Sequence, residues 1–483
     1  MSEQTPPPGP GPAAPDPEPV SQGPEGPAAE GPVAEGPVAE DPFAGAPEPA
    51  AALAEVAAAS PPDPEIPENL SGRGRFILQA VTEGNSFTVT VLAFFSALVV
   101  GGLINAFSNT TVLHAWSSPF SGHALAELWD TATGAYVALF EGSIFNPHTV
   151  AALFQQASFS TAVHNGYLSA VFMPLSETCV AATPLILAGL AVALPFQAGL
   201  FNIGGQSQFI GGAIVATYLG YGVSMPVFVH VVVCVIGGFV GGAAIGWLTG
   251  ELKARTGAHE VIVTIMLNYI MAYFLTYLLS FHYLMQAPGN ANPISVAIAS
   301  DAHLPLLFGS HLRINTGFLI ALACAVVVGW LLTRTTTGFE FRSIGKNASA
   351  SRVAGMNVER NWVLVMLIAG GLAGLAGSAV IQGTDFTLNN QSFGTYGIDA
   401  ITVALLGRGK PVGVVWAALL FGALRAGAPL MQAATGTQVD MVDVLQAVIV
   451  LFVAAPPLVR AIYRLRPPRA GGGGLTFSKG WNS

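Results

Sequence analysis

Long apolar runs separated by short polar segments fill the chain from about residue 76 onward. The run 87–107 holds 21 residues, which as a helix would rise about 31 Å and cross a hydrocarbon core of about 30 Å. Eight further runs have the same character: 180–200, 209–222, 227–248, 261–282, 318–332, 362–381, 412–428 and 442–459. A shorter run, 398–406, is typical of a broken or re-entrant helix. The pattern predicts an all-α polytopic membrane protein with about ten transmembrane or re-entrant helices.

The basic residues orient these helices, because Lys and Arg are retained on the cytoplasmic side of a membrane. They form five clusters, at 73–75, 253–255, 334–360, 408–410 and 460–469. If all five are cytoplasmic, ten crossings result and both termini lie inside. The segment 108–178, which has no Lys or Arg, and the segment 283–315 then lie outside. Arg313 and Arg425 are isolated, and we expect each near the outer boundary of a span.

Composition changes abruptly at about residue 72. The first 72 residues are rich in Pro, Ala, Gly and Glu and hold 13 of the 27 acidic residues but no Lys or Arg, so the remaining 14 acids and 18 bases give the rest of the chain a charge of +4. This segment has too little apolar surface to offset the chain entropy that folding would cost, which predicts that it is disordered. Docking to a partner is the alternative interpretation. We therefore expect a disordered tail (1–72), a transmembrane domain (73–465) and a cytoplasmic C-terminal tail (466–483).

Glycines recur at intervals of four inside two of the predicted spans. They are Gly238, Gly242 and Gly246 in one span and Gly370 and Gly374 in another. Small residues at this spacing let two helix backbones approach closely. The spacing predicts helix packing and no specific chemistry. Only 9% of all residues are charged, against about 25% in soluble proteins, so a lipid environment is the better explanation of the composition.

The longest basic loop between spans, 334–361, contains the sequence FRSIGKNASASRVAGMNVER. Asn347 or Ser349 can cap a short helix that ends near Gly355, with Ala350 and Ala354 on one face. A short, small-faced helix on the cytoplasmic side suits docking onto another protein. The alternative is a solvated positive loop that only orients the spans.

This segment resembles the coupling loop of ABC importer permeases in the branched-chain amino acid, ribose and nucleoside group, whose members carry a run similar to IGxNPxAARYAGI. The matching residues are Ile344, Gly345, Asn347, Ala350, Arg352, Ala354 and Gly355. Ala348 replaces the usual Pro, Ser351 the usual Ala and Val353 the usual Tyr. Residues 182–213, 257–270 and 396–415 are similar to nucleoside and simple-sugar permeases, and the IMLNYI run points to the nucleoside branch. The resemblance covers about residues 73–460.

The resemblance implies a permease subunit of an ATP-driven importer for nucleosides or related small polar solutes in a bacterial inner membrane. The partners that it implies are two ABC ATPase subunits, a second and distinct permease, and an external solute-binding protein. It implies no nucleic acid polymer as a partner. The ATPase-coupling residues would be Gly345, Asn347, Ala350, Arg352, Ala354 and Gly355. Simple sugars such as ribose or galactose are alternative solutes.

The sequence has no complete ATP-binding loop. Gly345-Lys346 and Gly409-Lys410 lack both the first glycine of a P-loop and the Ser or Thr after the lysine. We therefore expect that this chain is not an enzyme and binds no cofactor, and that partner subunits use ATP and Mg. An ion-coupled secondary carrier is the alternative from another class, but it should show carboxylates deep in its spans, and these spans hold almost none.

Neutral amides cluster where one apolar run ends and the next begins. Asn202, Gln206 and Gln208 lie there, where a discontinuous helix can line a cavity, and amides can hydrogen-bond hydroxyls and ring nitrogens without a buried charge. Two interpretations stay open for them, and for Asn268 and Asp399: lining of the translocation path, or hydrogen bonding between helices. Glu260 is interpreted as an N-terminal helix charge. No HExxH spacing occurs, so we expect no metal site.

Overall fold

The computed structural model describes residues 86–108, 112, 114, 122–155, 166–309 and 311–464 of the 483-residue chain. In this part every regular element is a helix, and only isolated bridges pair extended segments. The predicted tails, 1–72 and 466–483, lie outside the described residues, as does the beginning of the predicted 73–465 domain.

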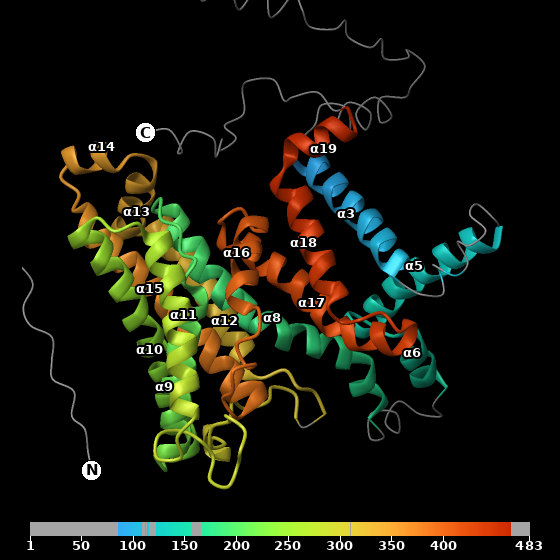
Figure 1. The fold of residues 1–483 in the computed structure, drawn as a ribbon, viewed down its shortest axis with the longest axis horizontal. Coiled ribbons are helices and arrows are strands. Elements are labelled where there is room, and N and C mark those ends of the chain that lie inside the picture. The colour runs from blue at the N-terminus through green and yellow to red at the C-terminus, as the bar shows by residue number, and fades with distance from the viewer. Residues whose placement is uncertain are drawn as a thin grey trace, which may run out of the picture. The chain divides into compact units, whose positions relative to one another are not determined.

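Figure 1 labels the α-helices, which are numbered in chain order. The first nine are α3 (Ser86–Ser108), α5 (Gly122–Ser143), α6 (Pro147–Phe154), α8 (Tyr167–Gln197), α9 (Gly205–Gly222), α10 (Val227–Thr256), α11 (Glu260–Leu279), η1 (Ser300–Ala302) and α12 (Thr316–Arg334). The others are α13 (Thr336–Lys346), α14 (Ala348–Val353), α15 (Val358–Val380), the π-helical turn η2 (Ile381–Asp385), α16 (Tyr396–Leu406), α17 (Pro411–Thr435), α18 (Met441–Ala454) and α19 (Pro456–Ile462).

Seven of the described helices are long and apolar enough to cross a membrane: α3, α8, α10, α11, α12, α15 and α17. Together, α18 and α19 would make an eighth span, with a bend of 84° between them. Each of the ten apolar runs found in the sequence falls on a helix, but α16 is too short and α9 too rich in Gly and Gln to count by itself. An all-helical membrane fold is confirmed, and a total of ten crossings stays a prediction.

The segment 108–178, in which the sequence predicted no span, contains α5, α6 and the first turns of α8. α5 carries Glu127, Asp130 and Glu141, which interrupt any apolar run. It packs against α17, where a Cβ added to Gly427 would lie 2.3 Å from the Leu139 carbonyl oxygen. The amphipathic helix is therefore held by close backbone contact with a spanning helix.

α8 is the central helix of the core. Its residues from Ala182 to Pro195 are all buried, and it packs against α9, α12, α15, α16 and α17. The buried face surrounds the whole helix, which is the pattern of a helix enclosed by other helices. Any movement of α8 therefore has to be accommodated by most of the domain.

The glycines at intervals of four bring α10 and α15 together, which confirms the close helix packing that the spacing predicted. A Cβ added to Gly242 would lie 2.2 Å from the Gly370 carbonyl oxygen, and one added to Gly374 would lie 2.2 Å from the Gly238 carbonyl oxygen. No side chain fits between the two backbones at these positions. Contact between the backbones therefore replaces the side-chain packing of an ordinary helix pair.

Two basic segments lie at the same end of the helices. α13 and α14 are at this end together with α19, whereas the loop between α11 and α12 is at the opposite end (Figure 1). Arg342 and Lys346 belong to α13, Arg352 to α14 and Arg460 to α19. One end of the described helices is therefore marked by positive charge.

Candidate functional site

The loop between α12 and α15 folds into two short helices, α13 and α14. Asn347 Oδ1 accepts a hydrogen bond from the Ala350 N–H at 2.9 Å, so Asn347 caps α14. Gly355 follows the helix with φ at +86°, a conformation that suits glycine. The prediction of a short helix that is capped by Asn347 and ends near Gly355 is confirmed, whereas Ser349 lies inside the helix.

The outer surface of α14 contacts little of the described chain. Val353 is 91% exposed, and Ala350 and Ala354 are exposed beside it. Arg352 forms an ion pair with Glu359 at the start of α15, at 2.5 Å. Because both charged side chains are also exposed, this pair contributes little to stability. The surface offers an exposed apolar side chain among small residues, which is suited to contact with another protein.

The other side of this loop contacts the end of α8. A Cβ added to Gly345 would lie 2.2 Å from the Gln197 carbonyl oxygen and 2.9 Å from the Gly199 nitrogen. The Gln197 Nε2 group in turn donates to the Gly409 carbonyl oxygen at 2.9 Å. The loop, the end of the central helix and the turn before α17 are therefore joined by close backbone and side-chain contacts.

Asn202 and Gln208 are fully buried and bind each other through both of their amide groups. Asn202 Nδ2 donates to Gln208 Oε1 at 2.9 Å, and Gln208 Nε2 donates to Asn202 Oδ1 at 3.1 Å. Asn202 Nδ2 also donates to the Ala191 carbonyl oxygen at 3.1 Å. Proline at position 195 has no N–H to bond that carbonyl within the helix. The amide pair satisfies the carbonyl left free by Pro195.

Asn268 holds the start of α9 from α11. Its Oδ1 accepts from the Ser207 N–H at 2.9 Å, and its Nδ2 donates to the Ile203 carbonyl oxygen at 3.0 Å. Gln206 lies beside them against Gly397 of α16. Of the two interpretations of the amide cluster, Asn202, Gln208 and Asn268 therefore show hydrogen bonding between elements. Lining of the path by these residues stays a prediction.

Asp399 forms an ion pair with Arg425 inside the helices. Arg425 Nη2 lies 2.7 Å from Asp399 Oδ2, and the two side chains are only 22% and 13% exposed. The Thr395 hydroxyl also donates to Asp399, at 2.8 Å. The sequence predicted Arg425 near the outer boundary of a span, but α17 continues to Thr435 and places it well inside the helix. An arginine at the centre of a membrane helix costs roughly 2.5–3.5 kcal/mol on insertion scales, so such residues face partners or cavities.

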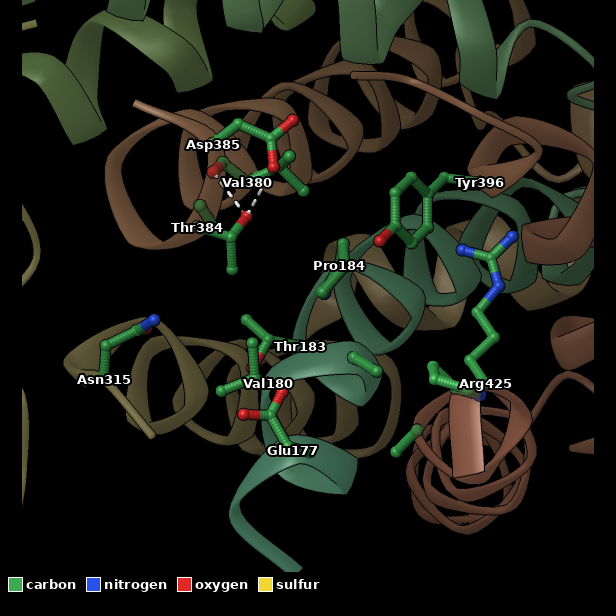
Figure 2. Close-up of a pocket in the computed structure, with 14 residues that line it drawn as sticks. Glu177, Val180, Thr183, Pro184, Asn315, Val380, Thr384, Asp385, Tyr396 and Arg425 are labelled. Carbon is green, nitrogen blue, oxygen red and sulfur yellow. Dashed lines mark hydrogen bonds between the residues drawn. The ribbon is translucent and has the colours of Figure 1, made fainter. Parts of the chain in front are cut away.

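A cavity of about 270 Å³ opens beside Arg425. Its lining comes from α8, the start of α12, the end of α15 with η2, the start of α16, and α17, and consists of Glu177, Val180, Ala181, Thr183, Pro184, Asn315, Ala379, Val380, Thr384, Asp385, Tyr396, Arg425, Ala426 and Pro429. Figure 2 shows Asn315 across the cavity from Arg425, with Asp385 and Glu177 on the two remaining sides. Of the five residues predicted to line the path, none lines this cavity, and Asp399 reaches it only through Arg425.

Sequence reasoning missed the cavity because its polar residues come from distant segments. Glu177 and Asn315 precede apolar runs, and Asp385 follows one, so each looked like the end of a span. Two signals were present. Arg425 was an isolated charge near the outer end of the predicted span 412–428, and Pro184 and Pro429 interrupt two long apolar helices. Within the described residues, no three His, Cys, Asp or Glu side chains come together in a way that could bind a metal ion.

Comparison of the sequence with known protein families identifies one family that it matches. A model described as "Branched-chain amino acid transport system / permease component" matches residues 175–454. The match is more than half of the chain and includes the α13–α14 loop, the amide cluster and the cavity. The chain belongs to this permease family. Its members are permease components of ABC importers, so this chain is a multi-pass transport subunit and the sequence resemblance is confirmed.

The permease is similar in sequence to three characterised members of the family. It is 35% identical over 339 residues to the guanosine ABC transporter permease protein NupP of Bacillus subtilis, covering 70% of this chain and 94% of the relative. The nucleoside ABC transporter permease protein NupB of Lactococcus lactis is 36% identical over 310 residues, which cover 61% and 82%. The glucose ABC transporter permease protein TsgB13 of Haloferax volcanii is 34% identical over 291 residues, which cover 58% and 75%. No solved structure matches the permease.

Proposed function

We propose that this permease forms the translocation path of an ATP-driven importer for nucleosides. The observation that carries the proposal is the 35% identity over 94% of the Bacillus guanosine permease, which a second nucleoside permease supports. The cavity fits this solute class, because its lining mixes hydrogen-bonding groups with apolar side chains. Nucleosides are uncharged and carry both hydroxyl groups and an apolar ring surface.

A simple sugar is the second candidate solute. The Haloferax glucose permease is almost as similar as the nucleoside permeases, and the ribose import permease of Escherichia coli is 28% identical over half of this chain. Sugars carry the same hydroxyl donors as the ribose of a nucleoside. Membership of the permease family excludes the alternative function drawn from the sequence, an ion-coupled secondary carrier.

The complete importer in this proposal contains four kinds of component. This chain pairs with a second, distinct permease in a bacterial inner membrane, two ABC ATPase subunits bind and hydrolyse ATP with Mg, and an external binding protein delivers the solute. This chain binds no cofactor. In support, neither of its two Gly-Lys pairs lies in a complete ATP-binding loop.

The contacts of the α13–α14 loop suggest how a movement driven by ATP hydrolysis is transmitted to the cavity. ATPase subunits would bind the exposed surface around Val353 and displace α13. Because Gly345 contacts the backbone of Gln197, this displacement would be transmitted to the end of α8. Thr183 and Pro184, near the middle of that same helix, line the cavity. The loop residues Gly345, Asn347, Ala350, Arg352, Ala354 and Gly355 would thus couple ATP hydrolysis to the translocation path.

The proposed topology has ten membrane crossings with both termini in the cytoplasm. The positively charged end of the helices, at α13, α14 and α19, then faces the cytoplasm. Arg352 in α14 is then cytoplasmic, and Asn146 before α6 is external. In a permease without Cys179, Cys234 and Cys324, we expect an impermeant thiol reagent applied to intact cells to label Asn146→Cys and not Arg352→Cys. Labelling in permeabilised cells provides the control, because it should reach both positions. Labelling of position 352 alone in intact cells would reverse the topology.

Uptake in cells tests the proposed solute. The permease, expressed with its cognate ATPase, second permease and binding protein in a host without nucleoside uptake, should accumulate radiolabelled guanosine or uridine. Glucose and ribose should not compete. A matched strain that carries an ATPase with an inactive ATP site should show background uptake. Accumulation of a sugar without any nucleoside would replace the proposal by the second candidate.

A further inference from the structure

The ion pair between Arg425 and Asp399 lies at the boundary between the cavity and the short helix α16. Arg425 lines the cavity, whereas Asp399 in the first turn of α16 does not. Ionised side chains within membrane helices are retained mainly where they serve transport or bind a partner. The position of the pair therefore raises the question of what Arg425 contacts on its cavity side.

The guanidinium of Arg425 is held by residues at the start of α16. Its Nη2 group donates to Asp399 at 2.7 Å and also to the Thr395 hydroxyl. The guanidinium carbon lies 4.5 Å from the centre of the Tyr396 ring, and this ring stacks in turn on Phe209 at 5.7 Å. These contacts come from residues 395–399 at the start of α16. Both of these hydrogen bonds use Nη2, and the guanidinium carries further N–H donors on Nε and Nη1.

Two prolines leave backbone carbonyls without their usual helical partners in the lining of the same cavity. Pro184 has no N–H to donate to the Val180 carbonyl, and Pro429 has none to donate to the Arg425 carbonyl. All four of these residues line the cavity. The carbonyl that Pro195 frees elsewhere in α8 is bonded by Asn202, but among the described residues no side chain donates to the carbonyls of Val180 and Arg425. These two carbonyls can accept hydrogen bonds from a solute.

Two carboxylates complete the lining. Asp385, in the π-helical turn η2, accepts from the Thr384 hydroxyl at 3.1 Å, and Glu177 forms an ion pair with Arg313 at 3.2 Å. π-helical turns occur frequently at functional sites. The cavity therefore combines several acceptors with the donors of Arg425, whose positive charge is already neutralised by Asp399. This lining favours an uncharged solute that is rich in O–H and N–H donors and disfavours a phosphorylated one.

We propose that Arg425 binds the solute directly, with Asp399 as its positioning residue, and that the cavity selects nucleosides over nucleotides. The inference rests on the proposed function and assigns its binding residue. Arg425 donates from Nε and Nη1 to a ring or carbonyl acceptor of the nucleoside. The carbonyls of Val180 and Arg425, together with Asp385, accept from the ribose hydroxyls and exocyclic amines.

A charge exchange separates binding from structural support. In the complete importer, R425D and D399R should each lower nucleoside uptake, and the double variant R425D/D399R should restore the amount of permease in the membrane, because it restores the ion pair. It should not restore the KM for uptake, which should stay about tenfold or more above wild type, since loss of a charged donor costs at least this factor. Recovery of both abundance and the wild-type KM would overturn the proposal and leave a structural ion pair.

A second variant covers the case in which the exchanged pair does not fold. R425K keeps the positive charge beside Asp399 but removes the planar donor fork and its stacking on Tyr396. We expect normal abundance with a raised KM, and an unchanged KM would overturn the assignment. If the wild-type importer takes up a sugar and no nucleoside, the proposed function fails separately. The same KM comparison on that sugar then decides the role of Arg425.

Discussion

Val353→Asp should reduce solute uptake to near background while the permease stays in the membrane at its normal amount. Val353 is 91% exposed at the end of α14, so its replacement disturbs almost no contact within the described chain. If the ATPase covers this side chain, the substitution buries an unpaired carboxylate in the interface. A buried contact of this kind is worth about 2 kcal/mol or more, which corresponds to roughly a thirtyfold loss of affinity.

The measurement is co-purification of the ATPase with the permease, combined with uptake. His259→Asp is a matched control, because His259 is exposed at the start of α11 near the basic pair Lys253 and Arg255 and outside the coupling loop. Aspartate is a favourable residue at this helix-capping position, so the control should be neutral. Normal ATPase binding and normal uptake in Val353→Asp would remove the coupling role of α14.

Gly242→Ala should abolish accumulation of folded permease. The added methyl group would lie 2.2 Å from the Gly370 carbonyl oxygen and 2.6 Å from the Gly374 Cα. Both neighbours are backbone atoms, so the strain is relieved only by moving α10 away from α15. Overpacking costs about 1–3 kcal/mol even where side chains can adjust, and here they cannot. We expect loss of the monodisperse detergent-extracted protein and a lowered melting temperature in any remainder.

Gly329→Ala is the control for this prediction. Gly329 also lies inside a membrane-spanning helix, but the nearest atom to an added Cβ is Pro411 Cβ at 4.0 Å. Alanine is the better helix former by about 1 kcal/mol, so this variant should be as stable as wild type or more stable. Equal behaviour of the two variants would show that the close backbone contact does not hold the domain together.

The features that could be predicted from sequence are those that depend on neighbouring residues. The helices follow from apolar runs, and the cap at Asn347 with the turn at Gly355 follows from local hydrogen bonding and backbone preference. Spacing alone also predicted that Gly242 lies in a close helix contact, but not which helix it contacts. Each of these depends on a stretch short enough to be read without knowing the rest of the chain.

The cavity could not be predicted in this way because it depends on contacts between distant segments. Arg425 and Asp399 are far from Glu177 and Asn315 in sequence, and only the packing of α8, α12 and α17 brings their helices to one place. The role of Asn202 was equally hidden, since it depends on a carbonyl freed by Pro195. α5 was missed because its acidic residues interrupt the hydrophobic pattern by which the membrane-spanning helices are identified.

ATP-dependent movement of nucleoside across the membrane of proteoliposomes tests the central claim most directly. The permease would be reconstituted with its second permease and its ATPases, with ATP outside the vesicles alongside the ATPases and the binding protein with labelled nucleoside inside. The account predicts that nucleoside moves from the lumen to the side that holds ATP. This movement should require ATP and the binding protein, and it should be lost in the Val353→Asp permease. Nucleoside movement that continues without ATP or without the ATPase subunits would contradict it.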